Sequence, residues 1–95
     1  MDIYISDEAA KWYEEELGLE NGDSVRFYVR YGGNSTIQPG LSLGVQIEKP
    51  ESAGSSLAKN GITYFIEEND MWYFDSHDLY ISMDKTLDEP SFDYK

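Results

Sequence analysis

Oxygen and nitrogen side chains of the types that ligate transition metals lie within four positions of one another near residue 76. Asp75 and His77 stand two residues apart, and His77 is the single histidine. Oxygen and nitrogen donors of these types bind non-haem iron, zinc or manganese. On a strand, residues two apart project from one face, whereas Asp78 projects from the other. Two ligands are too few for a tight site. Asp75 and His77 are therefore weak metal candidates, and a polar turn at the start of a strand is the favoured interpretation.

A glycine-rich loop, RYGGNSTIQPG at residues 30–40, is the second place where function is expected. Gly32 and Gly33 permit positive φ, so the conformational interpretation is the tip of a long hairpin. The functional alternative is a contact loop in which Asn34 and Ser35 supply neutral hydrogen-bond donors and acceptors. A small hydrolase or isomerase stays open as a third hypothesis, in which Ser35 needs a neighbouring base. The spacing does not match a phosphate-binding loop.

The charge balance restricts the partners of this chain. Seven Lys and Arg against nineteen Asp and Glu give a net charge of −12 over 95 residues. Affinity for nucleic acids and for anionic membrane surfaces comes largely from Lys and Arg, so the net charge argues against both kinds of partner. A basic protein partner fits better. No pair among the nineteen carboxylates stands out as a catalytic acid and base.

Cysteine is absent, which excludes disulfides, thiolate metal sites and thiol nucleophiles. The N-terminus MDIYISDE is acidic and lacks the features of a signal peptide. No apolar run approaches the roughly 18 residues that span a membrane. These observations predict a cytoplasmic protein without a membrane segment.

The elements that must position these residues follow from hydrophobic periodicity. Ser6 is typical of an N-cap, and the apolar spacing after it predicts an amphipathic helix over residues 7–17. Residues 24–31 and 41–48 alternate between apolar and polar, which predicts two strands. The two strands pair as a hairpin whose tip is the glycine-rich loop.

The second half of the chain is less regular. Residues 49–61 are rich in Ser and Gly and predict an exposed connection. A third strand is expected at 62–68, a short helical turn at 71–73, and a fourth strand at 77–84. The tail LDEPSFDYK, residues 87–95, carries no pattern and is a candidate mobile segment. It either docks on a partner as a short linear element or covers an edge strand of its own domain, and the second interpretation is favoured.

The predicted fold is mainly β, of the α+β class, with an N-terminal amphipathic helix and one domain over residues 1–95. The order of these elements, the motif GGNS at 32–35 and the closing pair Ser91-Phe92 resemble the HesB-like family of A-type iron–sulfur carriers. The resemblance implies a small β pseudobarrel or sandwich. In that family a Gly-Gly-Cys-Ser loop and a Cys-Gly-Cys-Gly-x-Ser-Phe segment hold iron or a cluster through three thiolates.

This chain departs from the family pattern at the ligand positions. Asn34 stands where the first cysteine is expected, and residues 88–90 occupy the place of the C-terminal cysteines. Iron–sulfur clusters are held mainly by Cys thiolates, so the resemblance implies the scaffold without a cofactor. It also implies that a C-terminal segment faces the loop through Asp88, Glu89, Ser91 and Phe92.

The favoured hypothesis is therefore a HesB-like domain that has lost its cluster ligands and binds an unidentified protein partner without catalysis. The alternative is a weak iron- or metal-binding accessory of iron–sulfur cluster biogenesis. The sequence identifies neither the partner nor the pathway, and the resemblance leaves a homo-oligomer open.

Overall fold

The computed structural model describes residues 1–95 and consists mostly of strands. The elements, in chain order, are β1 (Ile3–Ile5), α1 (Asp7–Glu16), β2 (Ser24–Tyr31), β3 (Leu41–Ile47), β4 (Ala53–Lys59), β5 (Ile62–Glu67), the 3-10 helix η1 (Glu68–Phe74), β6 (Leu79–Asp84) and β7 (Glu89–Tyr94). The predicted α+β class with an N-terminal helix is confirmed. No helix of the chain has the length and apolar character that a membrane crossing requires.

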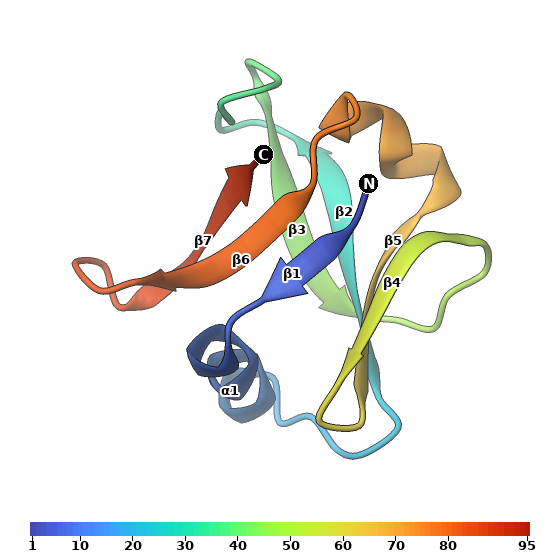
Figure 1. Ribbon diagram of the computed structural model, residues 1–95, viewed down its shortest axis with the longest axis vertical. Coiled ribbons are helices and arrows are strands. Elements are labelled where there is room, and N and C mark those ends of the chain that lie inside the picture. Colours follow the sequence, from blue (N-terminus) through green and yellow to red (C-terminus); the bar gives the residue numbers. More distant parts are fainter.

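The strands form two sheets (Figure 1). The larger sheet has the order β3-β2-β5-β4, with β2 parallel to β5 and an antiparallel partner on either side of that pair. The smaller sheet has the order β1-β6-β7, with β1 parallel to β6 and β7 antiparallel to it. The two sheets pack face to face as a sandwich and do not close into a barrel. Of the two architectures expected from the resemblance, the structure has the sandwich.

Helix α1 begins where the sequence predicts and follows its apolar spacing. The Ser6 hydroxyl oxygen accepts a hydrogen bond from the Ala9 N–H at 3.1 Å, which satisfies one free amide of the first turn. Ala9, Ala10 and Tyr13 are buried against the sheets. After the helix, Gly18 adopts a φ of +61°, the left-handed conformation that lets the chain turn away.

The core lies between the two sheets and under α1. Its aromatic centre is Phe27, whose ring lies 5.7 Å from Tyr13, 6.2 Å from Tyr64 and 5.8 Å from Phe92. Edge-to-face and offset contacts at these separations stabilise the packing beyond the burial of area. The buried cluster contains Ile3, Ile5, Ala9, Ala10, Tyr13, Val25, Phe27, Leu43, Ile62, Tyr64, Ile66, Tyr73, Phe74, Leu79 and Ile81.

Two segments differ from the sequence-based expectation, and a third decides between the alternatives that the sequence left open. The expected exposed connection at 49–61 contains β4, which pairs with β5. Residues 3–5 form β1, which was not predicted. The tail is not mobile: β7 pairs with β6 from Leu79↔Tyr94 to Asp84↔Glu89, so the alternative that the tail covers an edge strand is confirmed.

Candidate functional site

The glycine-rich loop between β2 and β3 is held by its own hydrogen bonds. The Gly32 N–H donates to the Gly40 carbonyl at 2.9 Å, and the Gly40 N–H donates to Asn34 Oδ1 at 2.9 Å. The Ser42 hydroxyl donates to the Gly32 carbonyl at 2.9 Å. Gly32 and Gly33 have φ values of +112° and +65°, which glycine adopts without strain. The Asn34 side chain therefore has a structural role, as the cap that closes the loop.

Further along the loop, Ser35 and Gln38 fix its far half. The Gln38 N–H donates to Ser35 Oγ at 3.0 Å, and the Gln38 side-chain amide donates to the Tyr73 carbonyl at 3.2 Å. The second bond ties the loop to η1. No hydrogen bond joins Ser35 to His77, whose Nδ1 lies 3.0 Å from the Phe74 carbonyl oxygen. The arrangement gives no support to Ser35 as a nucleophile with His77 as its base.

The loop and the C-terminal strand meet at a cavity of about 520 Å³. Phe92 and Tyr94 of β7 form one side of this cavity. The cavity is lined by Asn34, Ser35, Thr36, Ser42, Leu43, Phe92 and Tyr94. Of the C-terminal residues expected to face the loop, Phe92 lies in the lining.

The other expected C-terminal residues lie elsewhere. Ser91 projects from the opposite face of β7, where its hydroxyl is 3.5 Å from the Ser82 carbonyl oxygen. Asp88 precedes β7 in the turn, with a φ of +53°. Glu89 lines the neighbouring groove described below. Alternation along β7 separates these side chains, so the acidic residues do not converge on the loop.

The chemistry of the cavity is neutral. Its lining contains no carboxylate, imidazole, amine, guanidinium or thiol. The Tyr94 hydroxyl lies 2.9 Å from the Tyr73 hydroxyl. Burial, followed by this hydrogen bond, raises the pKa of Tyr94 above its ordinary value, so the phenol stays protonated at neutral pH. The cavity can donate and accept hydrogen bonds but has no group that acts as a general base near pH 7.

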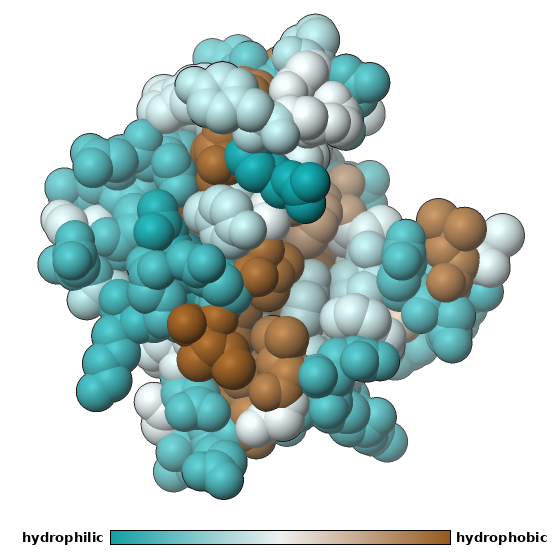
Figure 2. Space-filling model, turned by 180° about the vertical axis from the view of Figure 1, so that it is seen from behind, coloured by the Kyte–Doolittle hydropathy of each residue, from teal (hydrophilic) through white to brown (hydrophobic).

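A second groove of about 500 Å³ continues from this cavity, because both share Leu43 and Phe92. It runs between β3 on one side and α1 and β7 on the other. Its lining is mostly apolar and consists of Trp12, Tyr13, Leu17, Arg30, Leu43, Val45, Glu89, Pro90 and Phe92. We call the two hollows together the β3–β7 groove. Figure 2 shows apolar side chains gathered over the hollowed centre of the rear face, with hydrophilic residues around them.

The β3–β7 groove was missed by sequence analysis. The alternation along β3 assigns Leu43 and Val45 to a buried face, and the apolar pattern is the same whether a core or an open groove lies there. Only the structure shows that Ile47, at the end of β3, is 53% exposed although it lies on the same face as these residues.

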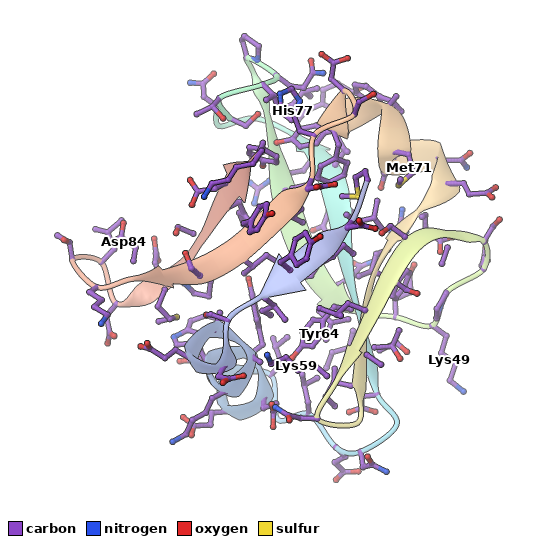
Figure 3. The ribbon with its side chains drawn as sticks, in the orientation of Figure 1. Lys49, Lys59, Tyr64, Met71, His77 and Asp84 are labelled. Carbon is purple, nitrogen blue, oxygen red and sulfur yellow. The ribbon has the colours of Figure 1, made fainter.

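The weak metal candidates do not assemble a site. Asp75 ends η1 in the left-handed conformation with a φ of +47°. His77 lies in the turn that follows and is bonded to the backbone of that same turn (Figure 3). Nowhere in the chain do three or more His, Cys, Asp or Glu residues gather as metal ligands would. Asp75 and His77 serve the turn between η1 and β6.

Comparison with known proteins gives the relationship of the chain. No family model matches it. The chain is 54% identical over 95 residues to the Bacillus subtilis protein named "Pyruvate dehydrogenase inhibitor", and the alignment covers 100% of both chains. This chain belongs to the family of that inhibitor. Uncharacterized relatives occur in Staphylococcus saprophyticus, 38% identical over 97% of both chains, and in Staphylococcus aureus, 32% identical over 100% of both chains.

Membership of the inhibitor family corrects the resemblance drawn from the sequence. The assignment to the HesB-like A-type iron–sulfur carriers is wrong, because the full-length relative carries a different name and no family model supports the assignment. The shared GGNS and SF motifs are short. In this chain the first shapes a hairpin loop closed by Asn34, and the second lies in a strand in which only Phe92 faces that loop. Turn and strand requirements explain both motifs without a cluster site.

Proposed function

We propose that this chain is a non-catalytic regulatory protein that binds a pyruvate dehydrogenase and lowers its activity. The observation that carries the proposal is the 54% identity, over the full length of both chains, to a protein named for that inhibition. The neutral lining of the loop cavity supports a binding role over catalysis, because it holds no group with a pKa near 7.

The size of the chain is sufficient for such a role. A standard protein–protein interface covers roughly 800 Å² on each partner. The chain exposes 5685 Å², so an interface of that size occupies about one seventh of its surface.

An activity titration tests the proposal. Purified pyruvate dehydrogenase complex is assayed at increasing concentrations of the purified chain, and we expect the rate to fall along a saturable curve. Gel filtration of the mixture should show the chain eluting with the enzyme. An unrelated protein of similar size and net charge controls for the effect of a polyanion. An unchanged rate, with no co-elution at a hundredfold excess of chain, refutes the proposal.

A further inference from the structure

The sandwich is joined along one side, where β1 lies beside β4. The Ser55 hydroxyl donates to the Met1 carbonyl at 3.1 Å, and Lys59 Nζ donates to the Ile5 carbonyl at 3.2 Å. Lys59 also pairs with Asp7 at 2.7 Å. These bonds connect the edge of the larger sheet to the edge of the smaller sheet, so the β4 edge is covered.

The opposite side is open. There β3 is the edge of the larger sheet and β7 the edge of the smaller sheet, on the side of the molecule away from β4 (Figure 1). The β3–β7 groove separates them, and its floor includes Leu43 and Phe92. A sandwich open at one edge leaves apolar floor residues accessible to a partner.

The alternation of hydrogen-bonded and non-hydrogen-bonded pairs between β2 and β3 shows which backbone groups of β3 are free. The Gly32 N–H bonds to the Gly40 carbonyl at one end of the hairpin, and the Glu48 N–H bonds to the Ser24 carbonyl at the other. In the β2–β3 register, every second residue of β3 between these ends is bonded to β2, namely 42, 44 and 46. The intervening residues therefore direct their N–H and C=O groups to the open edge. Of these residues, Leu43 and Val45 line the groove, and Ile47 follows them on the same face at the end of the strand.

The same alternation places the side chains of these three residues on the groove side of the sheet, opposite Val29, Phe27 and Val25 of β2. One set of residues thus offers both free backbone groups and apolar side chains. Strand addition uses this combination: main-chain bonds supply affinity, and alternate side chains enter pockets.

β3 also lacks the protection that exposed edges usually carry. Its sequence, LSLGVQI, has no charged residue and no proline. By contrast, β7 has Pro90 at its edge and carries Glu89 and Asp93. Charges and proline prevent edge-to-edge pairing, and their absence leaves β3 competent to pair.

The net charge of the chain indicates which kind of segment can pair with β3. Each copy of the chain has a net charge of −12, so a second copy is repelled, whereas a cationic segment is attracted. Building on the proposed function, we propose that β3 is extended by a strand of the pyruvate dehydrogenase. This strand is an extended segment with apolar side chains that enter the β3–β7 groove and with Lys or Arg on its other face.

A matched pair of variants tests the proposal on the purified chain and pyruvate dehydrogenase complex. Ile47→Lys places a charge on the groove side, where the side chain is already 53% exposed and folding is little affected. Leu87→Lys makes the same change from an exposed apolar side chain to a charged one, in the turn before β7 and outside the groove lining. We expect Ile47→Lys to raise the concentration for half-maximal inhibition at least tenfold, and Leu87→Lys to change it less than twofold.

Amide hydrogen exchange of the unmodified chain supplies a second, independent measurement. On binding, the free amides of Leu43, Val45 and Ile47 should exchange at least tenfold more slowly, because a new strand satisfies them. Thermal melting establishes that both variants fold. If Ile47→Lys does not fold, the exchange measurement alone decides.

The outcomes separate this inference from the proposed function. If the chain inhibits the enzyme while the two variants behave alike and the β3 amides stay unprotected, the docking surface is wrong and the function stands. If the chain neither binds nor inhibits, both proposals fall. Sedimentation showing a dimer of the chain that Ile47→Lys dissociates assigns the edge to self-association and overturns the proposal.

Discussion

Asn34 illustrates how a single side chain takes a structural role in a position that suggests chemistry. Its amide oxygen accepts the Gly40 N–H across the neck of the loop, which fixes the two glycine-rich ends relative to each other. A side chain committed to the backbone in this way shapes the cavity beside it. The loop is therefore one wall of the β3–β7 groove, closed by its own hydrogen bonds.

Replacing Asn34 tests this role. Asn34→Ala removes the acceptor and should lower the free energy of unfolding by about 1 kcal/mol, a usual net value for one hydrogen bond. The Gly40 amide should then exchange several times faster. Asn34→Asp keeps an acceptor oxygen at the same place and should preserve the slow exchange. Equal exchange rates in all three proteins would show that the side-chain bond is unimportant.

Two buried tyrosines differ in whether their hydroxyls have partners. Tyr64 is fully buried among aromatic rings, and its hydroxyl has no hydrogen-bond partner. Burial raises the pKa of Tyr64 to about 12. The Tyr73 hydroxyl, in contrast, is paired with that of Tyr94 at 2.9 Å. An unpaired buried hydroxyl costs free energy, whereas a paired one stabilises the fold.

The same substitution should consequently act in opposite directions at these two positions. Tyr64→Phe removes an unsatisfied group and should leave the free energy of unfolding unchanged or raise it. Tyr73→Phe deprives Tyr94 of its partner and should lower that free energy by about 1 kcal/mol. Urea titration of both variants measures the difference, and each variant is the control for the other. A larger loss for Tyr64→Phe would mean that its hydroxyl is bonded after all.

At the scale of elements, periodicity predicted the parts of the fold that have one buried and one solvated face. Strands β2 and β3 alternate over seven or eight residues, and α1 has a helical apolar stripe. β4, with the sequence AGSSLAK, has mostly small side chains and no alternation of apolar and polar residues. It is a strand because β5 beside it supplies a partner, which is information from the tertiary structure.

For a related reason, sequence analysis missed β1 and left the conformation of β7 open. Three residues are too few to show a period, and Pro90 with its acidic neighbours opposes a strand assignment for β7. Both strands owe their conformation to β6, which lies between them. The candidate site shows the same limit. The loop was located from its glycines, whereas the groove depends on how far apart β3 and β7 lie, which no local pattern encodes.

The contact between β4 and α1 gives a prediction on pH. Lys59, at the end of β4, reaches the start of α1 and lies 2.7 Å from Asp7 (Figure 3). The hydrogen bond and then the charge of Lys59 hold the pKa of Asp7 below its ordinary value. Because the folded pKa is lowered, the stabilisation is present above the unfolded pKa of about 3.9 and is lost as pH falls through the folded value.

An NMR titration of the Asp7 carboxyl measures this effect directly. We expect its midpoint to lie below 3.9 in the unmodified chain and to return toward that value in Lys59→Met. Lys85→Met, which removes an equal charge in the distant turn before β7, should leave the midpoint where it was. If both variants shift the Asp7 midpoint equally, net charge and not the contact is responsible.

At the scale of the whole molecule, the dominant property is the net charge of −12. Charge of one sign keeps copies of the chain apart and raises the rate at which an oppositely charged surface is met. An apolar groove with a free strand edge is a risk for aggregation, so self-repulsion has a protective effect here. The same field should direct encounters with a cationic partner and have less influence on how long the complex lasts.

The salt dependence of binding to the proposed partner, pyruvate dehydrogenase, tests whether charge acts mainly on the association rate. Between about 20 and 200 mM salt, screening shortens the range of the field, so the association rate constant should fall at least tenfold while the dissociation rate constant changes little. Replacing Glu14, Glu15 and Glu16 by Gln removes three of nineteen acidic groups and brings the net charge from −12 to −9. These residues lie outside the groove lining, so the variant should show a shallower salt dependence and an unaltered dissociation rate. Association that is insensitive to salt in both proteins would mean that apolar contact alone brings the partners together.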